Sequence, residues 1–92
     1  SALSLNTTGS NNIAFGTNAL FKNTTGSNNI ALGYQAGYQD TNGFSTLANL
    51  QNAVAIGSNA QVQASNSIVL GSIDTPVKVG IGTTIPSNTL SV

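Results

Sequence analysis

The stretch NTTGSNNIALGYQ, from Asn23 to Gln35, nearly repeats NTTGSNNIAFGTN, which runs from Asn6 to Asn18. Neither copy contains a side chain typical of catalysis, and each places Asn, Thr, Ser and Gly around a short apolar core. The pattern therefore predicts a turn followed by a strand, twice over. This is typical of a solenoid, in which similar units stack on one another.

A four-residue unit extends the repeat along the chain: a large apolar residue, Ala or Val, a second large apolar residue, and Gly. It begins at positions 13, 30, 54 and 68, with a looser copy at 79–82, so the spacings are 17, 24, 14 and 11 residues. A helical-pair repeat needs roughly 30 residues or more, whereas these spacings suit one coil of a β-roll. The longest spacing places an insertion at residues 40–51.

Side chains in each unit alternate between the two faces of the expected strand. We expect the larger residues to form the core of the roll: Ile13, Phe15, Ile30, Leu32, Val54, Ile56, Ile68 and Leu70. Small side chains let another backbone come close, so we expect the residues between them to form a subunit contact: Ala14, Ala31, Ala55 and Val69. The glycine after each unit fits a corner that needs a positive φ or has no room for a Cβ atom.

A second apolar register follows each glycine, with Ala19, Ala36 and Ala60 among its members, and predicts return strands that close the roll. From Thr75 the sequence changes to TPVKVGIGTTIPSNTLSV, in which Pro76 and Pro86 would each interrupt a ladder of strands. We therefore expect a β-roll domain over residues 1–74 and a connector over residues 75–92.

Length and composition indicate self-association. A domain of 92 residues buries only about two-thirds of the surface of its unfolded chain. The chain has no Cys for disulfides and no His, so oligomerisation is the expected supplement to its core. Its start at Ser1, without an initiator Met, is what we expect of a fragment.

Charge and hydropathy argue against several partners. Charged residues make up 4% of the chain and the net charge is zero, so we expect neither nucleic acid nor an anionic membrane surface as a partner. No apolar run approaches the roughly 20 residues of a membrane span.

The units SNNIALG, NAVAIGSNAQV and SNSIVLG resemble the head repeats of YadA-like trimeric adhesins. The resemblance covers about Asn6 to Val92 and implies an all-β fold, a left-handed parallel β-roll assembled as an intertwined homotrimer. The form NTTGSNNIALGYQAGYQ is more similar to versions in bacteriophage and large-virus tail-fibre proteins. The ending VGIGTTIPSNTLSV is similar to the connector that precedes an endosialidase-type intramolecular chaperone in such fibres.

The resemblance implies a non-enzymatic fibre segment that serves as a rigid shaft or head for host attachment on a virion. The alternative is the head of a bacterial surface adhesin. Such an adhesin would continue into a coiled-coil stalk, and no heptad pattern follows Val79, which favours the virion. The expected partners are further copies of the chain and a host-surface receptor or glycan. No cofactor and no metal are expected.

The inventory of catalytic groups argues against an enzyme. The chain's two carboxylates, Asp40 and Asp74, are 34 residues apart, and both stand in turn contexts. The stretch from Gly80 to Ile85 starts like a dinucleotide fingerprint but lacks its third glycine.

Two groups of residues are candidates for receptor contact. Tyr34, Gln35, Tyr38 and Gln39 would offer aromatic faces and amides to a glycan; alternatively, Tyr34 fills a corner and Tyr38 lies on a return strand. In the insertion, Phe44, Leu47 and Leu50 would form either a receptor-contacting tip or a plug that covers the roll.

A function of another class is ice binding by ordered threonines on a flat solenoid face. The pairs Thr7-Thr8 and Thr24-Thr25 repeat in register. Later coils carry Leu50-Gln51 and Ala64-Ser65 instead, so the array is expected to stop after two coils.

Overall fold

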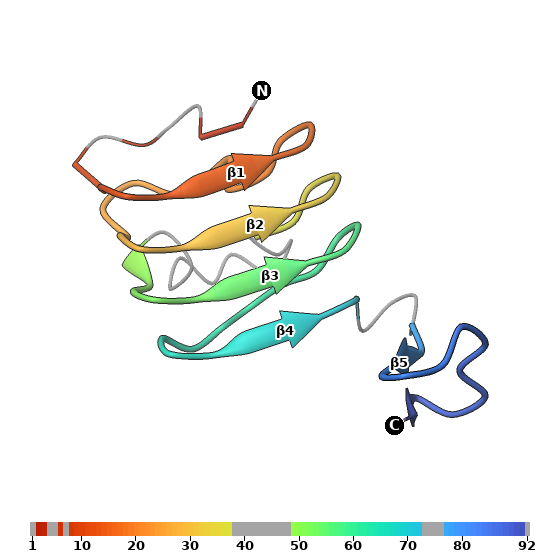
Figure 1. Cartoon of the computed structure of the whole chain (residues 1–92). Coiled ribbons are helices and arrows are strands. Elements are labelled where there is room, and N and C mark those ends of the chain that lie inside the picture. The colour runs from red at the N-terminus through yellow and green to blue at the C-terminus, as the bar shows by residue number, and fades with distance from the viewer. Residues whose placement is uncertain (1, 4–5, 7, 38–48, 73–76, 92) are drawn as a thin grey trace.

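The computed structural model describes residues 2–3, 6, 8–37, 49–72 and 77–91, and this part of the chain is all-β. The first sheet consists of β1 (Ile13–Phe15), β2 (Ile30–Leu32), β3 (Val54–Ile56) and β4 (Ile68–Leu70). The second consists of β5 (Val79–Gly80) and β6 (Leu90–Ser91). Figure 1 shows the four strands of the first sheet stacked in chain order, and the loops from β1 to β2 and from β3 to β4 pass behind the sheet.

All pairs in the first sheet are parallel, and their register follows the repeat. Ile13 lies opposite Ile30, Ile30 opposite Val54, and Val54 opposite Ile68. Each pair of strands is extended by a bond at the corner, where the N–H of Gly33 donates to Phe15 O at 2.8 Å and that of Gly57 to Leu32 O at 2.8 Å. The predicted all-β fold of stacked parallel strands is confirmed, and it is compatible with a β-roll.

The glycine that ends each unit adopts the backbone conformation predicted for it. Gly16 has a φ of 131° and Gly33 a φ of 129°, which side chains with a Cβ rarely adopt. Space is equally restrictive, because a Cβ added at Gly16 would lie 2.5 Å from Gly33 O. Successive corners therefore stack backbone on backbone.

The return half of each coil differs from its prediction, because the structure assigns no strand to residues 17–29 or 57–67. Stacked turns take the place of strands. The N–H of Leu20 donates to Ala36 O at 2.9 Å, and that of Gly37 donates to Ala60 O at 2.7 Å. Leu20 and Gly37 both have positive φ, 48° and 67°, so the same sharp corner recurs from coil to coil.

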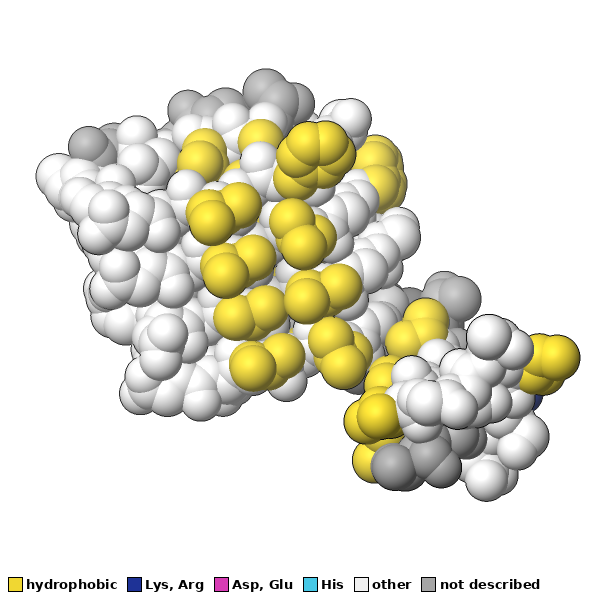
Figure 2. Space-filling view, viewed as in Figure 1, with side chains coloured by type: hydrophobic (Ala, Val, Ile, Leu, Met, Phe, Trp, Pro, Cys, Tyr) yellow, Lys and Arg dark blue, Asp and Glu magenta, His cyan; other side chains and the backbone are white. Residues whose placement is uncertain are grey.

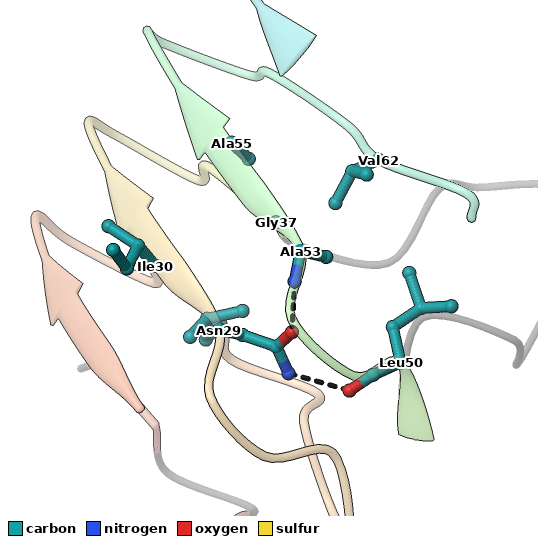
Figure 3. Close-up of a pocket in the computed structure, with 8 residues that line it drawn as sticks. Asn29, Ile30, Gly37, Leu50, Ala53, Ala55 and Val62 are labelled. Atoms are coloured by element: carbon teal, nitrogen blue, oxygen red, sulfur yellow. Dashed lines mark hydrogen bonds between the residues drawn. The ribbon is translucent and has the colours of Figure 1, made fainter. Parts of the chain in front are cut away.

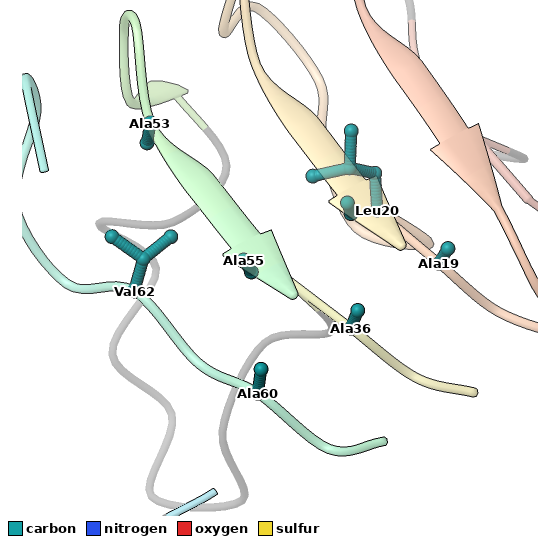
Figure 4. Close-up of a cluster of buried hydrophobic side chains, with 8 residues drawn as sticks. Ala19, Leu20, Ala36, Ala53, Ala55, Ala60 and Val62 are labelled. Atoms are coloured by element: carbon teal, nitrogen blue, oxygen red, sulfur yellow. The ribbon is translucent and has the colours of Figure 1, made fainter. Parts of the chain in front are cut away.

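The hydrophobic core lies between the first sheet and these turns and is built mainly from alanine (Figure 4). Ala31 and Ala55, the middle residues of β2 and β3, are fully or almost fully buried. Opposite them lie buried side chains of the return half: Ala19, Leu20, Ala36, Ala60 and Val62. Ala14 and Val69, the middle residues of β1 and β4, are half-buried and pack against this cluster.

The two faces of the sheet are therefore reversed relative to the prediction. The residues expected in the core point outward, and those expected at a subunit contact, Ala14, Ala31, Ala55 and Val69, point into the coil. The reason is geometric: a coil of 14 to 17 residues leaves little room between a strand and its return turns, and interiors pack to high density. Alanine fits this gap, whereas Ile or Leu at every level would force the coil apart.

The ladder of coils ends at β4. The loose fifth copy of the unit, Val79–Gly82, does not pair with β4; its first two residues form β5, which pairs with β6. Instead, the side chain of Val77 lies against Gly71, where a Cβ would collide with Val77 Cγ2. Val77 thus covers the corner on which a further glycine would have stacked. The predicted boundary at residue 74 lies outside the described residues.

Candidate functional site

The outer face of the first sheet is the main candidate for a functional surface. It presents eight large apolar side chains, one from each end of every strand. Figure 2 shows them as two columns side by side. We call them the apolar face: Ile13, Ile30, Val54 and Ile68 in one column, and Phe15, Leu32, Ile56 and Leu70 in the other. Parallel strands lie about 4.8 Å apart, so the members of a column touch along its length.

Six of the eight side chains of the apolar face are exposed, and the other two, Ile30 and Val54 on the inner strands, are half-buried. Phe15 is 78% exposed and Ile68 71% exposed on the outer strands, while Leu32 is 38% exposed on an inner one. With on the order of 150–200 Å² for a fully exposed large apolar side chain, the face offers roughly 600 Å² of apolar surface. That is at the upper end for the largest patch on a monomer, where such patches mark interaction sites.

Two asparagines, the half-buried Asn12 and the buried Asn29, hold the strands of the apolar face in register. The side chain of Asn12 accepts from the N–H of Asn29 at 3.0 Å and donates to Gly26 O at 2.7 Å. Asn29 repeats the arrangement one coil further, where it accepts from the N–H of Ala53 at 2.8 Å and donates to Leu50 O at 2.7 Å (Figure 3). Each amide thereby pairs backbone groups that lie just before a strand.

A cavity of about 10 Å³ lies inside the coils, beneath the apolar face (Figure 3). Its lining includes Leu20, Val62 and Ala55, with Asn29 as its polar member. This volume is about that of a single water, and both polar atoms of the Asn29 side chain are already bonded. The cavity is therefore a packing gap with no polar group left to hold a ligand.

The predicted glycan contact is described in part. Tyr34 is half exposed, and Gln35, with a φ of 56°, donates its N–H to Thr17 O at 2.8 Å. Tyr38, Gln39 and Phe44 lie outside the described residues, as does Leu47. The structure thus places Tyr34 and Gln35 on the corner that follows β2, next to the second column of the apolar face.

The structure describes three of the four threonines of the predicted array, Thr8, Thr24 and Thr25. Thr8 and Thr25 are exposed, and Thr24 is half-buried, with its carbonyl accepting the N–H groups of Thr8 and Gly9. In the next coil the register differs by two residues from the expectation, because Asn52 donates its N–H to Ser27 O and Gln51 thus lies level with Ser27. Thr25 is therefore level with Asn49, and the array ends after two coils.

Within residues 2–3, 6, 8–37, 49–72 and 77–91, no three side chains of His, Cys, Asp or Glu come together. In the same part of the chain, no helix is long and apolar enough to cross a bilayer.

Comparison with protein-family models, with curated proteins and with solved structures finds no match for this chain. The resemblance to YadA-like head repeats therefore stays a prediction from the sequence.

Sequence reasoning missed three features of the surface and its support. It picked out the residues of the apolar face but placed them inside the coils. It did not single out Asn12 and Asn29, although both stand directly before a large apolar residue in the repeated SNNIA segment. It also read Ile81, Ile85 and Leu90 only as parts of a connector, whereas all three are exposed apolar residues.

Proposed function

We propose that this chain is a non-enzymatic structural segment that self-associates through its apolar face. One observation carries the proposal: eight large apolar side chains stand in register on the outside of the first sheet, while the interior is already filled by alanine. A protein that needed these side chains for its own core would have turned them inward. Covering them against copies of the same chain removes them from water.

The proposed assembly is a homotrimer of left-handed parallel β-rolls, as in the YadA-like heads that the repeats resemble. The chain carries almost no charge, so its surface offers little electrostatic attraction to a charged molecule. This supports another copy of the chain as the partner. The described lysines, Lys22 and Lys78, lie outside the apolar face.

The proposed role is a rigid shaft or head in a viral or bacteriophage tail fibre, with the head of a bacterial surface adhesin as the alternative. Stacked coils suit a spacer, since backbone bonds and the side-chain amides of Asn12 and Asn29 link the coils to one another. The corner at Tyr34 and Gln35 is the proposed contact for a host receptor or glycan. This role requires no reaction, cofactor or metal.

Light scattering at low and high protein concentration tests the proposal. Three copies of the 9.2 kDa chain would have a mass of about 28 kDa. A mass near this value at both concentrations would support the trimer. A mass of two chains would keep self-association and overturn the trimer. A folded chain that stays at 9.2 kDa at high concentration would overturn the proposal.

A further inference from the structure

The first end of the ladder of coils carries return turns above its outer strand. β1 is the outer strand of the first sheet at this end, and it pairs with β2 alone. The N–H of Leu3 donates to Ala19 O at 3.0 Å, in the same way as the N–H of Leu20 donates to Ala36 O at 2.9 Å one coil further. Leu3 also has a positive φ of 52°, close to the 48° of Leu20. Part of one more level therefore stacks on the first coil, beside the free edge of β1.

The other end of the ladder has the complementary shape, a strand with a free edge. β4 pairs with β3, and the N–H of Gly71 donates to Ile56 O at 2.8 Å. The N–H groups of successive residues in a strand point to opposite sides, so those of Ile68 and Leu70 face the free edge. Such an edge pairs readily with another strand. Placed end to end, β4 of one copy would lie against β1 of a second copy and beside its return turns.

Val77 occupies the corner at which such an end-to-end contact would form. Inside the ladder each corner glycine lies against the next one, because a Cβ added at Gly16 would meet Gly33 O. A Cβ added at Gly71 would instead meet the side chain of Val77, at Cγ2. Gly16, at the first end, is exposed, whereas Gly71, at the last end, is buried. The last corner is thus covered by a side chain from the following segment.

A weaker contact closes the corner that precedes β4. Gln51 O accepts the N–H of Asn66 from the next coil at 3.1 Å. Ser65 stands level with Gln51, and its carbonyl accepts the hydroxyl of Ser67, from its own coil, at 3.3 Å. A hydroxyl group rotates to suit its partners, so this contact closes the edge less firmly than Val77 does.

We propose that Val77 is a stop that keeps copies of this chain from joining end to end, β4 of one copy against β1 of another. Its side chain fills the space that Gly16 of the second copy would enter. An end-to-end contact of this kind does not close on itself, so without the stop it would produce filaments. The inference goes beyond the proposed function and does not depend on it, because a single chain forms both ends of the ladder.

The test uses the full chain carrying Leu32→Asn and Ile56→Asn, which disrupts the apolar face and leaves both ends of the ladder unchanged. In this background, Val77→Gly opens the corner at Gly71. Val77→Ala is a second, milder variant that removes the methyl groups against Gly71 and keeps the Cβ atom. Ile81→Gly is the matched control, because it removes an exposed apolar side chain of the same segment.

Mass by light scattering and hydrogen exchange of the Leu70 amide are the readouts, and circular dichroism checks the fold. Both Val77 variants should grow with protein concentration, to a mean mass at least about three times that of the background chain. The Leu70 amide should gain at least about tenfold protection as the mass grows, because it then pairs with the next copy. Ile81→Gly should match the background chain in both readouts.

Four results would overturn the stop. In the first, the folded Val77 variants keep the mass of the background chain at every concentration. In the second, they grow while the Leu70 amide stays unprotected, which means that copies meet elsewhere. In the third, Ile81→Gly or the background chain grows as much as they do. In the fourth, both variants lose the folded coils, which means that Val77 supports the fold instead.

The proposed function is judged by a different chain. A native chain that is monomeric at every concentration overturns self-association through the apolar face and leaves the stop standing. Failure of the stop in the background chain leaves the apolar face untouched.

Discussion

The side-chain oxygen of Asn29 accepts the N–H of Ala53 at 2.8 Å, and so one amide joins the second coil to the third. The same side chain donates to Leu50 O at 2.7 Å and is 2% exposed. The core is mostly alanine, which buries little apolar surface. The hydrogen bonds of a buried amide therefore contribute much of the stabilisation between neighbouring coils. Hydrogen bonds here replace part of the apolar packing found in larger domains.

Replacing Asn29 with alanine should lower the free energy of unfolding by about 2 to 4 kcal/mol. The substitution leaves the N–H of Ala53 and the carbonyl of Leu50 without their partner, and a buried unpaired polar group costs about 1–3 kcal/mol. Ser58→Ala, at an exposed position, is the control and should stay within about 0.5 kcal/mol of the native chain. Urea unfolding at fixed protein concentration measures both, and equal midpoints would contradict the role of Asn29.

The reversal of the two sheet faces predicts opposite behaviour for neighbouring residues of β2. Ala31→Leu places a large side chain in the interior, and it should cost about 2 kcal/mol or more at every protein concentration. Leu32→Ala removes an outward side chain, and its effect should depend on concentration, because it weakens association more than the coil. Urea midpoints at two concentrations separate the cases. If Leu32→Ala were the more damaging at low concentration, the core would lie where the sequence pattern placed it.

The sequence pattern predicted the strands, their parallel register and the glycine corners. It did so because each depends on residues close together in the chain: an apolar residue two positions from another, and a glycine directly after them. The register of β1 with β2 follows from the near-identity of two segments, and Gly33 occupies the corner predicted for it.

Which face turns inward could not be read from the pattern. Alternation separates two faces, and in this chain both are apolar, since Ala31 stands between Ile30 and Leu32. The choice depends on the space between a strand and its return turns, which is a property of the closed coil. Apolar residues such as Ala19 and Ala60 predict strands in the return half, whereas its described residues form stacked turns that bond from coil to coil.

The stacked glycines predict a graded response to added methyl groups. Gly33 and Gly57 have similar φ values, 129° and 118°, so Gly to Ala imposes a comparable backbone strain at both. They differ in space: a Cβ at Gly33 would lie 2.8 Å from Gly57 O, whereas one at Gly57 would lie 3.3 Å from Gly71 Cα. Gly33→Ala should therefore destabilise the chain more, by about 1 kcal/mol or more beyond Gly57→Ala.

Thermal unfolding of the two glycine variants, followed by far-ultraviolet circular dichroism, measures the difference. Equal losses would mean that backbone strain alone explains the glycines. A larger loss at Gly57 would contradict the close stacking of corners between the second and third coils.

The apolar face predicts that association can be removed while the coils stay folded. Leu32→Asn with Ile56→Asn places two amides at the centre of the second column, where they would be buried without partners in any assembly. The association constant should fall by at least about a hundredfold, because truncation at the centre of an interface commonly costs 2 kcal/mol or more for a single residue. The inner side of β2 and β3 is unchanged, so the Gly33 amide should remain protected from exchange.

Ser58→Asn, which adds an amide at an exposed corner outside the column, is the control and should associate like the native chain. A double variant that keeps the mass of the native assembly would show that the apolar face is not where the copies meet.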